Sequence, residues 1–217
     1  MQKKMILKSD MRVYFDMDGT IAKWRDVPVE ESRKPGYYTD LEPETELLDF
    51  LSAALKADIN MNILSSYYTD TRALLEKKKW LDKYLPGISS SHCLFVPYGI
   101  NKAEFVETML HRKLGKMDIL VDDHTPNLTR WETAGGTGVK WLNGINGKNG
   151  RFEGIRVGRV EELKAAFDEI ADSTNYALSV FDMPERTIEE IRHFVGQRDL
   201  FYKKRMIITL LLIIGHW

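Results

Sequence analysis

Cysteine is nearly absent from this sequence of 217 residues, which contains only Cys93. A single cysteine excludes an intrachain disulfide framework and any zinc site built mainly from thiolates. It also fits a reducing, intracellular compartment. Little apolar sequence occurs near the start either: the only run, residues 5–7, is too short for the hydrophobic region of a signal peptide, so we expect none. We therefore expect a cytoplasmic protein.

An excess of charge of either sign is missing too. The chain has 31 basic and 32 acidic residues, so its formal net charge is -1. Without a basic field to hold phosphates along a backbone, the sequence gives no strong signal for binding DNA or RNA. The hydrophobic content of 43% and the charged content of 29% are ordinary for a globular protein. We therefore expect a small molecule as the binding partner, with assembly into a homo-oligomer left open.

Long apolar stretches are also scarce. The run over residues 206–214 is too short to span a membrane, because a spanning helix needs about 20 apolar residues. We expect a terminal strand or helix packed on the core. The alternatives are a membrane-surface anchor led by Lys203, Lys204 and Arg205, or an altered reading frame at the end of the gene.

Strand-like and helix-like segments alternate over the first two thirds of the chain. Strands are predicted over residues 11–15, 59–64, 92–96, 117–121 and 138–142. Helices are predicted over residues 43–56, 70–85, 101–113 and 126–134. Such alternation predicts an α/β fold with a doubly wound, Rossmann-like parallel sheet. The lysine run 77–79 on the second helix is predicted to be a solvated face.

The pattern changes after residue 151. A helix over residues 160–171, a strand over 176–181 and a helix over 184–195 predict an α+β C-terminal extension. We therefore expect a catalytic core over residues 1–150 and an extension over residues 151–217. The extension either closes the core or forms a small appended module.

Polar side chains follow four of the predicted strands. They are Asp16 and Asp18, then Ser65 and Ser66, then Lys102, and finally Asp122 and Asp123. Ligands of doubly wound sheets bind outside the carboxyl ends of the strands, so these side chains are expected to meet. Clustered carboxylates suit Mg²⁺, and hydroxyls with an ammonium suit a phosphate dianion.

The same residues occur in four ordered motifs: DMDGT, the serine of NILS, the lysine of NKAEF and the paired aspartates of ILVDD. In order and spacing they resemble the motifs of the haloacid dehalogenase (HAD) superfamily, over residues 11–150. The resemblance implies that Asp16 is the nucleophile that forms an aspartyl-phosphate. It also implies that Asp18 is the general acid and then the general base.

The resemblance further implies a phosphate site and a Mg²⁺ site. Ser65 and Lys102 would hold phosphoryl oxygens, with Ser66 beside them. Asp16, the backbone carbonyl of Asp18 and the pair Asp122 and Asp123 would hold the metal, Asp123 directly and Asp122 through water. Each residue alone has a simpler interpretation, since Asp and Gly form turns and Asp caps helices. The prediction depends on their joint placement at strand ends.

Residues 21–41 leave room for at most a very small cap domain. The segments DMDGTIAKW and ILVDDHTPNLTRW resemble sequences of the 5'(3')-deoxyribonucleotidase-like branch of this superfamily. In that branch, aromatic residues after the first motif contribute to a nucleotide pocket. Trp24, Tyr37 and Tyr38 are the candidates here, because aromatic faces stack on bases. Packing is the alternative role for Tyr37 and Tyr38.

The sequence thus predicts a Mg²⁺-dependent phosphomonoester hydrolase that acts on nucleoside 5'- or 3'-monophosphates. A phosphatase for a sugar phosphate or a nucleic-acid end is the alternative within enzymes. A HAD-fold binding or regulatory module without turnover is the alternative outside enzymes.

Overall fold

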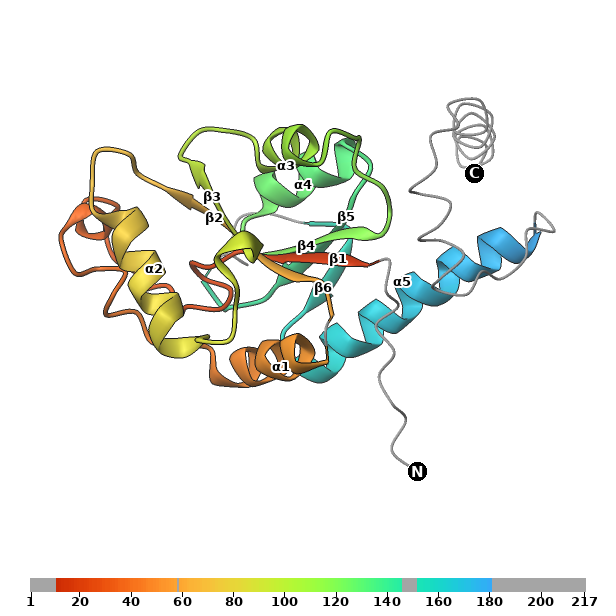
Figure 1. The fold of residues 1–217 in the computed structure, drawn as a ribbon, viewed down its shortest axis with the longest axis horizontal. Helices are drawn as coiled ribbons and strands as arrows, with labels where there is room; N and C mark the ends of the chain where they lie inside the picture. Colours follow the sequence, from red (N-terminus) through yellow and green to blue (C-terminus); the bar gives the residue numbers. More distant parts are fainter. Residues whose placement is uncertain (1–10, 58, 146–151, 181–217) are drawn as a thin grey trace. The chain divides into compact units, whose positions relative to one another are not determined.

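The core of the molecule is a parallel sheet with the strand order β3-β2-β1-β4-β5-β6 (Figure 1). The computed structural model describes residues 11–57, 59–145 and 152–180. The strands are β1 Arg12–Phe15, β2 Met61–Tyr67, β3 Cys93–Pro97, β4 Asp118–Asp122, β5 Thr137–Trp141 and β6 Ile155–Val157. The first five confirm the predicted strands, with ends shifted by a few residues.

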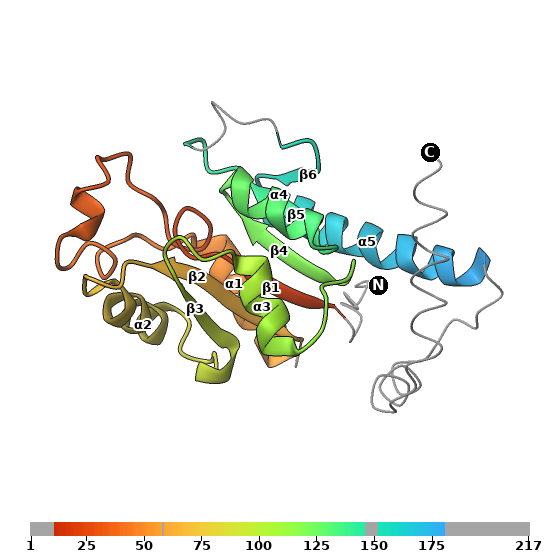
Figure 2. The same cartoon turned by 90° about the horizontal axis from the view of Figure 1, so that it is seen from above.

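Helices cover both faces of the sheet. They are α1 Thr45–Lys56, α2 Ala73–Tyr84, α3 Lys102–Leu110, α4 Thr125–Thr133 and α5 Val160–Val180, with short 3-10 helices at Glu31–Arg33 and Ser90–His92. In the view from above, α3 and α4 lie on the near side of the sheet and α1 and α5 on the far side (Figure 2). The doubly wound α/β fold is therefore confirmed.

Alternation along the strands explains the two layers. Val13 and Phe15 belong to a core cluster with residues of α1, α2 and α5, whereas Tyr14 belongs to a second cluster with residues of α3 and α4. Successive side chains of a strand point to opposite faces, so a strand covered on both sides is apolar throughout. The sequence VYF just before Asp16 meets that requirement.

Strand register places the site residues at one edge. Phe15 of β1 pairs with Val121 of β4 and with Ile63 of β2. Asp16 and Asp122, which follow Phe15 and Val121, therefore lie at the same level at the end of the two strands. The carboxyl ends of three neighbouring strands thus meet at the center of the sheet.

The segment between β1 and α1 contains one 3-10 helix and no further helix or named strand, as its residues are all described. This agrees with the prediction of at most a very small cap. The segment lies beside α2 in both views (Figures 1 and 2). Glu76 of α2 accepts hydrogen bonds from the backbone N–H of Gly36 and Tyr38, and the indole of Trp80 donates to the carbonyl of Leu41.

The predicted strand over residues 176–181 is wrong, because helix α5 continues to Val180. No glycine or proline interrupts residues 160–180, and a short apolar run does not by itself distinguish a strand from a helix. The three-residue strand β6 was not predicted, and it extends the sheet beside β5. Phe167 of α5 is buried in the core.

The first of two compact units ends at Ala177. The predicted helix 184–195 and the apolar run 206–214 lie outside the described residues. Within the part of the chain that the structure describes, no helix is both long enough and apolar enough to cross a membrane.

Candidate active site

Three carboxylates meet at the carboxyl edge of β1 and β4. One oxygen from each of Asp16, Asp122 and Asp123 lies within 4.8 Å of the other two. All three residues are buried. Buried carboxylates repel one another and lose hydration, so such a cluster is costly unless cations compensate it. Oxygen ligands of this kind fit a hard divalent cation such as Mg²⁺.

Lys102 supplies one compensating charge from within the protein. Its Nζ donates to Oδ1 of Asp16 at 2.6 Å and to Oδ2 of Asp122 at 2.8 Å. Asn101 caps α3 by accepting from the backbone N–H of Ala103, and this cap places Lys102 at the first helical position. The structure therefore brings together the lysine and the carboxylates that the sequence predicts.

The pKa values in this cluster reflect burial and charge. Burial raises the pKa of Asp16 to about 6, with the Lys102 ammonium opposing that rise and the Asp122 and Asp18 carboxylates adding to it. Burial works against the charge of Lys102, but the carboxylates of Asp122 and Asp16 outweigh it and raise the pKa of this lysine. Without a metal, Asp16 is therefore protonated more easily than an ordinary aspartate, and Lys102 keeps its charge.

Both carboxylate oxygens of Asp122 accept hydrogen bonds. Its Oδ1 accepts from the backbone N–H of His124 at 2.7 Å. Its Oδ2 accepts from Lys102 and from the amide of Asn127, the latter at 2.9 Å. The contribution of His124 to the cluster is therefore made by its backbone N–H.

Asp123 is fixed from the β5 side. The side-chain amide of Asn143 donates to Oδ2 of Asp123 at 2.7 Å and to the carbonyl of Gly19 at 3.0 Å. Lys140, buried within β5, donates to the carbonyl of Asp123 at 2.9 Å and to Oγ1 of Thr125 at 2.8 Å. Sequence reasoning missed Lys140, because a lysine inside a strand is normally exposed.

Glycine is required at position 19 of the DMDGT motif, because the turn there passes close to the side chain of Asp123. Its φ of +81° lies in the left-handed region that favours glycine. A Cβ added there would stand 2.3 Å from Oδ2 of Asp123 and 2.9 Å from Nδ2 of Asn143. The turn after β1 can therefore close over the Asp123 carboxylate only with glycine at this position.

A second lysine enters the site from the other side, and the prediction of a solvated face is wrong for it. Lys78 and Lys79 are exposed, but the side chain of Lys77 is fully buried. Its Nζ contacts Oδ2 of Asp18 and donates to Oγ of Ser65 at 2.9 Å and to the carbonyl of Ser66 at 2.5 Å. Helical spacing offered the signal that was missed: Lys77 stands four residues from Ala73 and four from Leu81, both buried.

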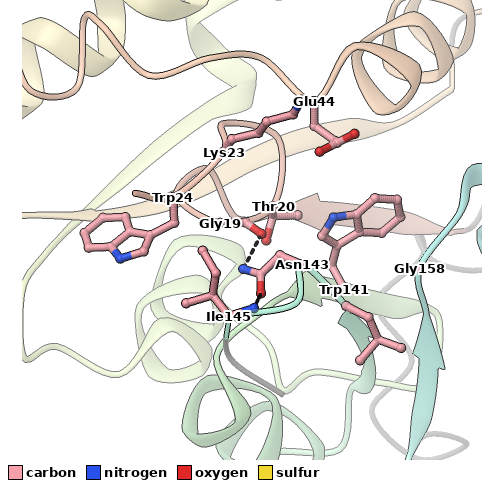
Figure 3. Close-up of a pocket in the computed structure, with 10 residues that line it drawn as sticks. Gly19, Thr20, Lys23, Trp24, Glu44, Trp141, Asn143, Ile145 and Gly158 are labelled. Carbon is pink, nitrogen blue, oxygen red and sulfur yellow. Dashed lines mark hydrogen bonds between the residues drawn. The ribbon is translucent and has the colours of Figure 1, made fainter. Parts of the chain in front are cut away.

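The predicted aromatic residues divide between the core and a pocket. Tyr37 and Tyr38 are buried within the core cluster, and the Tyr37 ring meets Trp24 edge-on at 5.5 Å between ring centroids. Trp24 lines a pocket of about 310 Å³ next to the carboxylate cluster. Trp24 and Trp141 lie on either side of Gly19 and Asn143 in this pocket (Figure 3).

The pocket is adjacent to the carboxylates but does not contain them. Its lining includes Asn143, which donates to Asp123 and to the carbonyl of Gly19. Lys23 and Glu44 line it on the other side of Gly19 from Asn143 (Figure 3). A group bound there would sit beside the site and not on the nucleophile position.

Comparison with known proteins agrees with this architecture. No family model matches the sequence, and no curated protein matches it. Among solved structures, D,D-heptose 1,7-bisphosphate phosphatase from B. bronchiseptica is 17% identical, with a TM-score of 0.55 over 75% of this chain and 99% of its own. The enzyme of the same name from Burkholderia thailandensis is 12% identical, with a TM-score of 0.54 over 72% of this chain and 97% of its own.

A HAD family hydrolase from Deinococcus radiodurans R1 is 12% identical, with a TM-score of 0.51 over 76% of this chain and 98% of its own. At such identities a likeness in structure shows the fold alone. That fold is the Rossmann-like α/β fold of HAD-superfamily hydrolases.

Proposed function

We propose that this protein is a Mg²⁺-dependent phosphomonoester hydrolase with Asp16 as its nucleophile. The observation that carries the proposal is the meeting of Asp16 with Asp122, Asp123 and Lys102 at the carboxyl edge of the central strands. The phosphatases named above share the fold, and one of them is described as complexed with magnesium and phosphate. A buried anionic cluster with a neighbouring ammonium is the chemistry that phosphoryl transfer requires.

The proposed reaction has two steps. In the first, a carboxylate oxygen of Asp16 attacks phosphorus, the bond from phosphorus to the leaving oxygen breaks, and Asp18 gives its proton to that oxygen. In the second, water attacks the aspartyl-phosphate while Asp18 takes a proton from it. Inorganic phosphate is released, and Asp16 and Asp18 return to their starting states. Ser65 and Lys102 hold the phosphoryl oxygens, with Ser66 beside them.

The residues present fit one divalent cation. Asp16 and Asp123 would bind it directly with the backbone carbonyl of Asp18, and Asp122 would act through water. The three hydrogen bonds that the Asp122 carboxylate already accepts support this division. When bound, Mg²⁺ lowers the repulsion between the two anions and stabilises the charge that develops on the transferring phosphoryl group.

A nucleoside monophosphate is the proposed substrate, and the pocket beside the site supports it. Trp24 offers an aromatic face there, and bases stack on such faces. Tyr37 and Tyr38, being buried, support the walls of the site in this proposal. A sugar phosphate is the alternative substrate, because two phosphatases with this fold are named for a heptose bisphosphate.

Phosphate release from a panel of nucleoside monophosphates, sugar phosphates and p-nitrophenyl phosphate tests the proposal. We expect release with Mg²⁺, loss with EDTA, and a decrease of about 10³-fold or more in Asp16→Asn, since the nucleophile is removed. Asp82→Asn, at an exposed position of α2, is the matched control and should keep full activity. If the folded wild type releases phosphate from no substrate, the proposal is wrong, and a binding module or an enzyme for a macromolecular substrate replaces it.

A further inference from the structure

Lys77 is a buried cation that the metal cluster does not explain. Its Nζ contacts Asp18 and Ser65, whereas the carboxylates of Asp16 and Asp122 are paired with Lys102. The face of the Tyr38 ring lies 4.7 Å from the same Nζ and favours a cation there. The inference that follows rests on the proposed function, because it concerns the phosphate of the same site.

The Asp18 carboxylate that contacts Lys77 is placed so that another anion can replace it. Oδ1 of Asp18 is buried and has no hydrogen-bond partner among the described residues, so the carboxylate is held through Oδ2. The Asp18 side chain keeps 18% of its surface exposed, while that of Lys77 keeps none. Asp18 therefore covers the ammonium and can turn away from it without breaking any other hydrogen bond.

Ser65 links the ammonium to the phosphate position. Its Oγ accepts from Lys77, which leaves the hydroxyl proton free to be donated to another acceptor. Ser65 lies on β2 two residues after Ile63, which pairs with Phe15 just before Asp16. A phosphoryl group attached to, or attacked by, Asp16 would thus lie within reach of Ser65 and Lys77 together.

We propose that Lys77 is a second phosphate-binding cation, which exchanges Asp18 for a phosphoryl oxygen when phosphate binds. The exchange gives Nζ a new anionic acceptor and frees the Asp18 carboxylate, which takes up a proton from solvent and then gives it to the leaving oxygen. Lys77 and Lys102 then flank the phosphate from opposite sides, one from α2 and one from α3. A cation that only neutralised Asp18 would hold that carboxylate in place and would not contribute to phosphate affinity.

Binding of inorganic phosphate to the full-length protein with Mg²⁺, measured by calorimetry, tests the proposal. We expect Lys77→Met to weaken phosphate binding about tenfold or more, because a charge-assisted hydrogen bond to phosphate is lost. Lys79→Met is the matched control, an exposed lysine of the same helix, and should bind phosphate like the wild type. Lys77→Arg keeps the charge and should recover part of the affinity.

Lys77→Gln provides a second test if the methionine variant fails to fold. It keeps a hydrogen-bond donor for Asp18 and Ser65 but removes the charge, so we expect a similar loss of phosphate affinity. A folded uncharged variant that binds phosphate within twofold of the wild type would overturn the proposal. Circular dichroism and urea unfolding establish which variants are folded.

The two proposals fail in different ways. A wild type that hydrolyses phosphomonoesters while Lys77→Met keeps its phosphate affinity would refute the role of Lys77 and leave the proposed function intact. A folded wild type that neither hydrolyses any substrate nor binds phosphate with Mg²⁺ would refute both. A Lys77→Met variant with reduced kcat and unchanged phosphate affinity would assign Lys77 to positioning Asp18 alone.

Discussion

The two sides of the site each contribute one buried lysine, but the two lysines have different surroundings. On the metal side, made of Asp16, Asp122, Asp123 and Lys102, the ammonium bridges two carboxylates. On the α2 side, made of Asp18, Ser65, Ser66 and Lys77, the ammonium contacts one carboxylate, one hydroxyl and one carbonyl. The first lysine compensates fixed charge, whereas the second has neutral partners and one movable anion.

The difference separates charge compensation from ligand binding. Removing one partner of a buried ion pair is strongly destabilising, because the remaining charge is left uncompensated in a medium of low polarity. Lys102 leaves two such charges behind when it is removed, and Lys77 leaves one that reaches solvent. Both lysines are proposed to contact phosphate, but the metal side should contribute more to the stability of the fold than the α2 side.

The largest expected effect is that of Lys102→Met. In EDTA near neutral pH it should lower the free energy of unfolding by about 3–5 kcal/mol, since Asp16 and Asp122 lose their shared counter-ion. Mg²⁺ should restore part of the loss, because a ligand that binds only the folded state stabilises it. Urea unfolding measures both effects. Lys113→Met, an exposed control on the segment after α3, should stay near the wild type. A loss below about 1 kcal/mol would contradict this view of the metal side.

The pH dependence of stability offers the next test of the metal side. The pKa of Asp16 rises from 3.8 to about 6 in the folded protein, so the folded state holds a proton more tightly than the unfolded state. The resulting stability is fully present below about pH 4 and is lost as the pH rises through 6. Asp16→Asn does not titrate. In EDTA, the wild type should therefore lose up to about 3 kcal/mol of its free energy of unfolding relative to Asp16→Asn between pH 4 and pH 7. A difference that stays constant with pH would contradict the raised pKa.

The metal side is also the part of the site that the sequence predicts best. Asp16, Lys102 and Asp122 each stand just after a strand or at the start of a helix, and the carboxyl ends of parallel strands meet in space. Local rules suffice there, since strand order and helix capping fix where each residue lies. The same rules predict the doubly wound sheet, because five apolar strands alternate with four helices.

The α2 side is predicted less well because its contacts are tertiary. Lys77 lies in the middle of a helix, in a run of three lysines, and composition alone indicates solvent. Only the position of Lys77 between Ala73 and Leu81 places it on the buried stripe. Its partners, Asp18 and Ser65, come from segments far away in the sequence.

Strand β6 was missed for a different reason, since three residues are too few to show a periodic pattern.

Two glycines with positive φ, one next to the metal side and one outside the site, provide a test with a smaller expected effect. Gly19, at φ +81°, faces Oδ2 of Asp123, while Gly36, at φ +90°, has Oδ2 of Asp40 as its nearest atom at 3.7 Å. Alanine is strained at both positions, which costs about 1 kcal/mol. Gly19→Ala should lose about 2 kcal/mol or more from the free energy of unfolding, because a steric clash adds to the strain. It should also weaken Mg²⁺ binding, and Gly36→Ala should not. Equal losses would show that Asp123 can move aside freely.

The smallest expected effect is the loss of stability in Lys77→Met, and it tests whether Lys77 and Lys102 have different roles. We expect about 1 kcal/mol in urea unfolding, because Asp18 can turn to solvent and methionine keeps the packing of the lysine stem. A weak contact is what exchange with a phosphoryl oxygen requires, since the phosphate must outcompete Asp18 for the same ammonium. If Lys77→Met instead destabilises the protein as much as Lys102→Met, the pair of Lys77 and Asp18 is a fixed part of the fold. The two sides of the site would then differ in their residues but not in their roles.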